Sequence, residues 1–201
     1  GTTLLRYINL LYLYVKRKNV FSNIFHKKAN INFLNSFDTK YLGYFSKDFR
    51  SANTYINHAS IDAFKKSKMQ FFILPIFINF AYGSGHLNVL IYNKTTHNLE
   101  YFEPHGLQDL EELRKRKNMV ESIRTDLKLK GLKIDSVIYL SQYLPGPQHY
   151  NSIEYSKTCK GDPAGFCQAW SFWFVDYRVK HYQKDANELI NQFMDDLINN
   201  E

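Results

Sequence analysis

The sequence predicts an α+β fold in which a mixed central sheet carries helices packed on it. Two observations predict the sheet: the near-continuous apolar run MQFFILPIFINFA, and two apolar stretches on either side of the turn-rich segment KTTHN. A third observation predicts the helices, since apolar residues recur at intervals of three and four residues over 4–15 and 109–130. The 201 residues suffice for one domain with a full core, and we place no domain boundary within 1–201.

The first third of the chain predicts two helices separated by irregular structure. Apolar residues at helical spacing over 4–15 predict an amphipathic helix, and its expected role is core packing. The polar and aromatic region 19–48 should consist of loops with short elements. A short helix over 53–67 should then place Ile61 and Phe64 on one face.

The middle of the chain predicts the sheet. The run beginning at Met69 is typical of a strand buried on both faces, and Pro75 requires an edge or a bulge because it cannot donate a ladder hydrogen bond. The stretches 87–93 and 99–104 read as an antiparallel hairpin. The segment 133–140 should return as a further strand.

Three further helices are expected. Residues 109–130 should form one helix that ends at Gly131, a common helix terminator. A loop rich in Pro and Gly follows over 141–165. The chain should finish with a helix over about 166–182 and another over about 186–199.

Charge and composition restrict the partners. The chain carries 26 Lys and Arg against 19 Asp and Glu, a net charge of +7, which would suit an acidic partner. The charges are dispersed, however, and the densest basic cluster, within 113–130, is interleaved with acids and helix-spaced apolar residues. We therefore interpret it as a solvated helix face, and we expect no nucleic-acid requirement.

Cysteine content and hydropathy indicate the compartment. Cys159 and Cys167 are the two cysteines, and no secretory leader with a small-residue cleavage site is evident, so we expect a reducing cytosol or nucleus. The longest apolar stretches fall short of the ~20 residues that span a bilayer, so no membrane span is expected. Because the chain begins with Gly1 rather than Met, we expect either a fragment of a longer chain or an added residue at its start.

Cys167 is the candidate nucleophile. It opens the predicted helix that begins in GFCQAWSFW, and the N–H groups and dipole of a helix N-terminus favour the reactive thiolate. The alternative is a buried cysteine that fills space, which is the commoner role of a single cysteine. Cys159 lies in the predicted loop and is interpreted as an incidental thiol.

A catalytic cysteine needs a base and a group that orients it. His86 follows the Gly-rich YGSG at the start of a predicted strand, where its side chain can face a cleft. Its competitor is His105, in the turn PHG. Glu103 closes the partner strand of the hairpin, so the hairpin should bring Glu103 beside His86. Taken alone, Glu103 fits a rim salt bridge equally well.

Acyl transfer also needs donors for the developing oxyanion. Gln148, in LPGPQ, can supply a side-chain amide, with Gln142 and Gln168 as competitors. The chain order is then His, Glu, Gln, Cys, whereas papain-like enzymes have Cys first.

These residues resemble a superfamily of cysteine peptidases, that of the ubiquitin-like-protein-specific (SUMO) proteases and the adenovirus protease. Its members share the order His, acid, Gln, Cys, with the His opening one strand and the acid closing the next. The resemblance covers about 53–182, with 1–50 as an N-terminal extension. GHLNVLIYNKTTHNLEYFEPHG, GPQ and GFCQAWSFW look most like divergent members from large DNA viruses and intracellular microbes. It implies a papain-like core in permuted order, with Cys167 at the N-terminus of the central helix.

The sequence departs from this pattern in three places. Many members have Trp after the catalytic His, where this chain has Leu87. The family Gln usually lies about six residues before the Cys, where this chain has Gly161, so Gln148 corresponds to it only with an insertion. The acid is Glu103 rather than Asp, as in the related bacterial effector acetyltransferases.

The resemblance implies a thiol protease or isopeptidase that cleaves after a small residue, Gly, in ubiquitin or ubiquitin-like conjugates. Leu87, Gly165 and Phe166 would contact the substrate. The alternatives are a viral polyprotein endopeptidase and an acetyltransferase, and a non-enzymatic binding module is a further one. We expect a monomer without cofactor or metal, acting in the cytoplasm or nucleus of a host cell or packaged in a virion.

Overall fold

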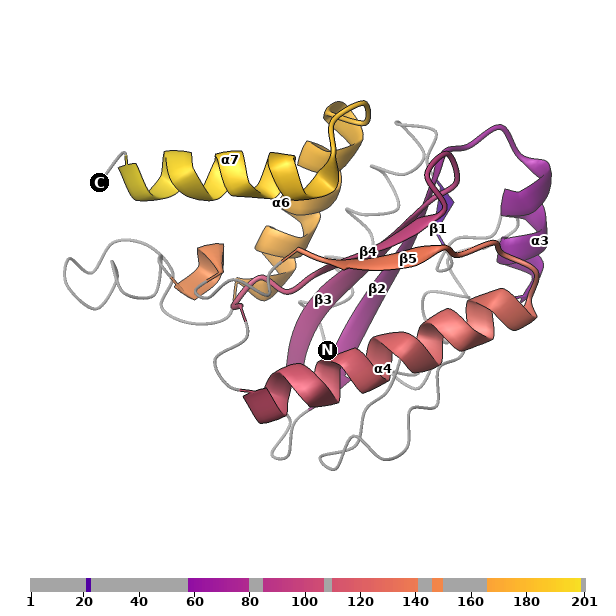
Figure 1. Cartoon of the computed structure of the whole chain (residues 1–201), viewed down its shortest axis with the longest axis horizontal. Helices are drawn as coiled ribbons and strands as arrows, with labels where there is room; N and C mark the ends of the chain where they lie inside the picture. Colours follow the sequence, from indigo (N-terminus) through magenta and orange to yellow (C-terminus); the bar gives the residue numbers. More distant parts are fainter. Residues whose placement is uncertain are drawn as a thin grey trace, which may run out of the picture.

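A mixed sheet with helices on both faces forms the centre of the computed structural model (Figure 1). The structure describes residues 21–22, 58–79, 85–106, 110–140, 146–149 and 166–199. Its elements are β1 (Phe21–Ser22), α3 (His58–Lys66), β2 (Phe71–Asn79), β3 (Gly85–Asn93), β4 (Asn98–Phe102), α4 (Leu110–Leu129), β5 (Ser136–Tyr139), α6 (Cys167–Lys180) and α7 (Ala186–Asn199). The predicted α+β class with a mixed central sheet is confirmed.

The five strands lie in the order β1-β2-β3-β4-β5. β2, β3 and β4 form an antiparallel meander, and the edge strands β1 and β5 run parallel to β2 and β4. The predicted 87–104 hairpin is therefore correct. β4 ends at Phe102, which pairs with Val89, so the first four residues of β3 extend beyond β4.

Pro75 of β2 lies outside the two positions at which β1 pairs with that strand. β2 pairs with β1 at Phe72 and Ile73, and Pro75 pairs with Val89 of β3 on its other side. Within the described residues, no strand faces Pro75 from the β1 side, so its missing N–H breaks no ladder bond there. In the part of the chain that the structure describes, this placement agrees with the edge expected at the proline.

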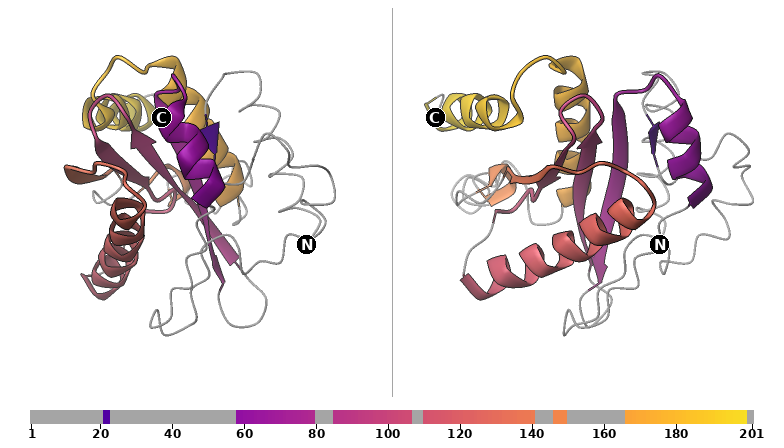
Figure 2. Two further views of the ribbon diagram at one scale, coloured as in Figure 1. Left: turned by 90° about the vertical axis from the view of Figure 1, so that its right-hand side faces the viewer. Right: turned by 45° about the vertical axis from the view of Figure 1, so that its right-hand side comes forward.

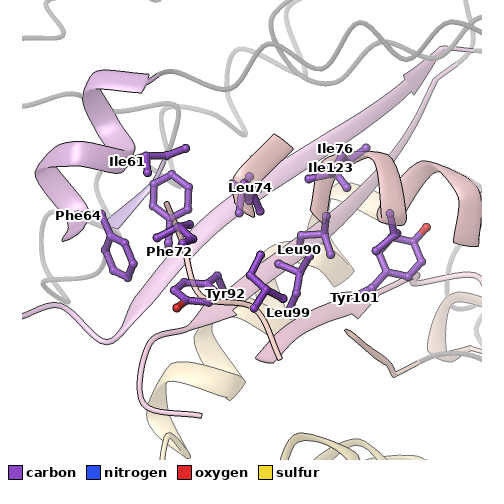
Figure 3. Packing of buried hydrophobic residues seen from close by; sticks show 14 of the residues in the cluster. Ile61, Phe64, Phe72, Leu74, Ile76, Leu90, Tyr92, Leu99, Tyr101 and Ile123 are labelled. Carbon is purple, nitrogen blue, oxygen red and sulfur yellow. The ribbon is translucent and has the colours of Figure 1, made fainter. Parts of the chain in front are cut away.

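Helices α3 and α4 cover one face of the sheet. Ile61 and Phe64 of α3 are fully buried, as their spacing predicted, and the Phe64 ring packs against Phe72 with 5.2 Å between centroids. Figure 3 shows Ile61 and Phe64 beside Phe72 of β2, while Ile123 of α4 lies farther along the same cluster. The core on this face comprises Ile61, Phe64, Phe72, Leu74, Ile76, Leu90, Tyr92, Leu99, Tyr101, Met119, Val120, Ile123, Leu127, Leu132 and Ile134.

Helices α6 and α7 cover the opposite face (Figure 2). Phe174 of α6 stacks on Phe102 of β4, with 4.3 Å between ring centroids. Arg178 binds Glu100 of β4 through two hydrogen bonds of 2.7 and 2.9 Å, and both side chains are buried. Trp170 and Trp173, on the first turns of α6, are partly buried against the same core. This packing fixes α6 across the sheet, with its N-terminus beside the start of β3.

The remaining expectations concern the end of α4 and segments outside the described residues. α4 ends before Gly131, whose φ of +84° lies in the left-handed region that glycine adopts without strain. The N-terminal helix predicted over 4–15 lies outside the described residues, as do most of 19–48 and of the 141–165 loop. Among the helices that the structure describes, none is long and apolar enough to cross a membrane.

Candidate active site

His86 is the second residue of β3, in the part of that strand that extends beyond β4. Its side chain is 13% exposed, and its Nε2 lies 2.5 Å from Oε1 of Glu103. At this point β3 has no partner residue in β4. The His86 imidazole contacts Glu103 and Cys167, which come from other segments of the chain. The predicted position of His86 at a strand entry is thus correct.

Glu103 follows β4 directly and is almost completely buried. Besides His86, its Oε1 accepts a hydrogen bond of 3.0 Å from the backbone N–H of His105. The two residues are 17 positions apart, and the hairpin brings them together because β3 and β4 run antiparallel. A carboxylate held by a backbone donor in this way has little freedom to turn from the imidazole.

Cys167 is the first residue of α6 and its side chain is buried. The backbone N–H of Leu87 lies 3.4 Å from Cys167 Sγ and donates to it, and Ser171, one turn later, donates to the Leu87 carbonyl at 3.0 Å. Cys167 also hydrogen-bonds the side chain of His86. The fold therefore brings together His86, Glu103 and Cys167 from three separate elements.

The two contacts of His86 assign a different role to each of its imidazole nitrogens. Because Nε2 of His86 is engaged with Glu103, Nδ1 is the nitrogen left to face Cys167. A histidine held on one side by a carboxylate and on the other by a thiol can carry a proton between the sulfur and a substrate atom. This chain of contacts is the geometry that nucleophilic cysteine catalysis needs.

Two opposing effects act on His86. Burial of the imidazole disfavours its charged form and lowers its pKa, but the Glu103 carboxylate and the Cys167 thiol favour the imidazolium and outweigh burial. Together they raise the pKa of His86 from 6.5 to about 9. His86 is therefore charged at neutral pH, which indicates that the site rests as an imidazolium beside the sulfur.

Glu103 is held in its ionised form. Burial alone would raise the pKa of its carboxyl, yet His86, Arg116 and the N–H of His105 stabilise the carboxylate and lower that pKa below its ordinary value. Glu103 therefore stays negative at neutral pH and supports the charge on His86.

Arg116 of α4 is a site residue that sequence reasoning missed. It is 2% exposed, and its Nη1 lies 3.5 Å from Glu103 Oε2. The sequence interpretation assigned this basic cluster to a solvated helix face, which is wrong for Arg116. A signal was present: Arg116 shares the intervals of three and four residues with Leu113, Val120 and Ile123, and so lies on the apolar face of α4.

The backbone of Gln148 is hydrogen-bonded to the turn that follows Glu103. Residues 147–149 form a short helical turn, and the backbone N–H of Gln148 donates to the carbonyl of Pro104 at 2.9 Å. Its side chain is buried. Gly146 similarly donates to His105 at 3.1 Å, so this segment is bound to the turn that carries Glu103.

Gly146→Ala is expected to destabilise this junction. A Cβ at Gly146 would come within 2.5 Å of the Pro104 carbonyl oxygen and 2.6 Å of the Gly106 nitrogen, and both are backbone atoms that cannot rotate away. The two segments would have to separate, at a cost of about 1–3 kcal/mol in free energy of unfolding. Urea denaturation of the variant measures this loss, and an unchanged midpoint would contradict the close approach.

The other candidate residues are placed as follows. The expected substrate contact of Leu87 stays a prediction: its side chain is completely buried, and its backbone N–H donates to Cys167 Sγ. Phe166 is 51% exposed beside Cys167 and is open to a substrate. The competitor His105 contributes its backbone N–H to Glu103, and its ring packs against His149 at 5.4 Å. Gly165, Gln142 and Cys159 lie outside the described residues.

Metal chemistry has no evident site in the described part of the chain. There, no three His, Cys, Asp or Glu side chains are grouped so that they could hold a metal ion.

Comparison with known proteins gives one informative relationship. No protein-family model matches the chain. The chain is similar to a protein of Acanthamoeba polyphaga mimivirus described as "Putative ankyrin repeat protein L371", with 30% identity over 148 residues. The matched region is 67% of this chain but 19% of that protein, so the chain spans about a fifth of its relative's length.

This finding overturns the family resemblance drawn from the sequence. The similar protein carries an ankyrin repeat description, so the assignment to the SUMO protease and adenovirus protease superfamily is wrong and is withdrawn. An ankyrin repeat is a β-turn with two helices in about 33 residues. The described part of this chain is a mixed sheet covered by helices, so the name of the relative does not give the fold seen here. What the chain does must be argued from its site.

Proposed function

We propose that the chain is a thiol peptidase in which Cys167 is the nucleophile, His86 the acid and base, and Glu103 the residue that orients His86. One observation carries the proposal: the His86 side chain is hydrogen-bonded both to Glu103 and to Cys167. This support comes from geometry and electrostatics and is independent of the withdrawn resemblance. We also propose a papain-like core in permuted chain order, and the place of Cys167 at the start of a helix packed on the histidine strand supports it.

The proposed reaction begins with the Cys167 thiolate and the His86 imidazolium. The sulfur attacks the substrate carbonyl carbon, and His86 gives its proton to the leaving amine as the C–N bond breaks. The acyl group remains on sulfur as a thioester. Neutral His86 then takes a proton from water, the hydroxide attacks the thioester, and the carboxylic acid leaves as the thiolate and the imidazolium re-form.

The oxyanion formed in each step needs hydrogen-bond donors. We propose the backbone N–H groups in the first turn of α6 together with the side-chain amide of Gln148. No acidic side chain lies in that first turn, so no carboxylate of α6 itself opposes the developing charge there. Gln148 is buried and bonded to the turn that carries Glu103, which supports its inclusion.

The substrate is a separate part of the proposal. Cleavage after a small residue in ubiquitin or a ubiquitin-like modifier came from the resemblance, so it is retained as the first substrate class to test rather than as a property of the site. A viral polyprotein and acetyl transfer from acetyl-coenzyme A are the alternatives. The expected cytoplasmic or nuclear location and the monomeric state remain proposals as well.

A thiol-reactive probe panel tests the reaction class. Ubiquitin, SUMO and short Gly-ended peptides, each carrying a C-terminal electrophile, should label the native chain, and Cys167→Ala should abolish labelling while Cys159→Ala leaves it intact. Mass spectrometry of the adduct locates the modified residue. Labelled acetyl-coenzyme A, run in parallel, should transfer no acetyl group. If no probe reacts while acetyl transfer to Cys167 occurs, the peptidase proposal fails in favour of a transferase.

A further inference from the structure

Arg116 is the one buried charge near the candidate site, among the described residues, that the reaction scheme leaves without a role. Its guanidinium is 2% exposed and lies opposite Oε2 of Glu103 at 3.5 Å, while Oε1 faces His86 and the His105 N–H. The carboxylate is thus shared between two cations, one on each oxygen. Because all three groups are buried, water screens these charges poorly.

Among the described residues, the next polar groups of this cluster are the Tyr101 hydroxyl and the Asn88 amide. The Tyr101 hydroxyl hydrogen-bonds Arg116 and accepts from Asn88 Nδ2 at 2.7 Å, and burial raises the pKa of Tyr101, which keeps it uncharged. Cys167 faces the other side of His86. The charged and titratable groups that act on His86 and Glu103 are therefore Cys167, Arg116 and Tyr101, and Arg116 is the permanent cation among them.

The position of Glu103 does not depend on Arg116 alone. The backbone N–H of His105 already holds Oε1, and the ion pair between Arg116 and Oε2 is longer than a strong hydrogen bond. The main effect of Arg116 is therefore on charge. It keeps Glu103 ionised, and it takes up part of the negative charge that would otherwise act on His86 alone.

We propose that Arg116 is a positioning residue that acts through Glu103: by sharing the carboxylate, it weakens the hold of Glu103 on the His86 imidazolium enough for His86 to release its proton to the leaving group. The role in proton release rests on the proposed peptidase function. The charge sharing itself does not, and it is measured on the free protein.

The first measurement is the titration of His86, followed by NMR of histidine-labelled protein, with His86→Gln used to assign the signal. The native midpoint is expected near pH 9. Arg116→Met, which keeps the length but removes the charge, should move that midpoint upward, because Glu103 then acts on His86 alone. Arg116→Lys keeps a positive charge and should restore a midpoint close to the native one.

Arg178→Met is the matched control. Arg178 is also 2% exposed and also pairs with a buried glutamate, Glu100, but it touches no member of the site. Breaking either buried pair should cost stability, so both variants should unfold at lower urea concentration. Only Arg116→Met should move the His86 midpoint. An equal shift in Arg178→Met, or no upward shift in Arg116→Met, would overturn the proposal.

Turnover gives the second readout once a substrate is found. Arg116→Met should lower kcat about 3- to 10-fold with little change in KM, because a more tightly held proton makes His86 a weaker acid. If Arg116→Met raises KM at unchanged kcat, the role in proton release is wrong. If no substrate is ever cleaved, the peptidase proposal fails, and the titration result still decides whether Arg116 shares the charge of Glu103.

Discussion

His86→Ala is expected to reduce the rate of peptide or modifier cleavage by about 10²–10⁴-fold, which is the usual contribution of a general acid and base. The imidazole contacts both Glu103 and Cys167, so its removal leaves the sulfur without its counter-charge and the leaving amine without a proton donor. Steady-state kinetics at pH about 7 with the substrate found by probe labelling measure the loss. The effect should appear in kcat rather than in KM.

Two variants make this result interpretable. Glu103→Ala removes the orienting carboxylate but leaves the imidazole beside Cys167, so it should slow turnover less than His86→Ala does. His97→Ala removes a histidine at the hairpin turn, whose imidazole pairs with the half-exposed Asp135, and should leave activity at the native level. Full activity in His86→Ala would end the assignment of the triad.

The His86–Glu103 pair is expected to make the stability of the protein fall between pH 6.5 and about 9. Folding raises the pKa of His86 from 6.5 to about 9, so the folded state binds this proton more tightly than the unfolded chain does. The stabilisation is complete below pH 6.5, declines as the pH rises and is lost above about 9. A shift of this size corresponds to about 3 kcal/mol in free energy of unfolding.

Urea denaturation at a series of pH values between about 6 and about 10 measures this loss. The same series on His86→Gln supplies the control, since that variant lacks the titrating group but keeps every other alkaline group of the chain. The difference in unfolding free energy between the two proteins should shrink as the pH rises. If it stays constant across the range, His86 does not gain its proton affinity on folding.

Much of the fold could be predicted because its elements are strongly patterned. The apolar run that became β2, the turn signals between β3 and β4, and the glycine that ends α4 each have one dominant local cause. The association of His86 with Glu103 also followed from local rules, since a hairpin of known register brings a strand start beside the end of its partner. These features depend on short-range sequence.

The features that were missed depend on tertiary packing. Arg116 carries a charge that composition assigns to solvent, yet a helix packed on a sheet buries whatever lies on its inner face, and Glu103 compensates the charge there. The burial of the Leu87 side chain was not predicted either, because sequence does not show which face of a strand start will meet α6. The family resemblance was wrong because similar short motifs do not by themselves establish a common origin.

Leu87 has a wider consequence for how the site tolerates change. Its N–H donates to the Cys167 sulfur and its carbonyl accepts from Ser171, so the backbone of one residue of β3 holds the first turn of α6 at a fixed place along the strand. The alignment of Cys167 with His86 is therefore encoded where helix and strand meet, and not in the length of chain that connects β5 to α6. Changes in the length of that connection should therefore leave the nucleophile in register with its histidine.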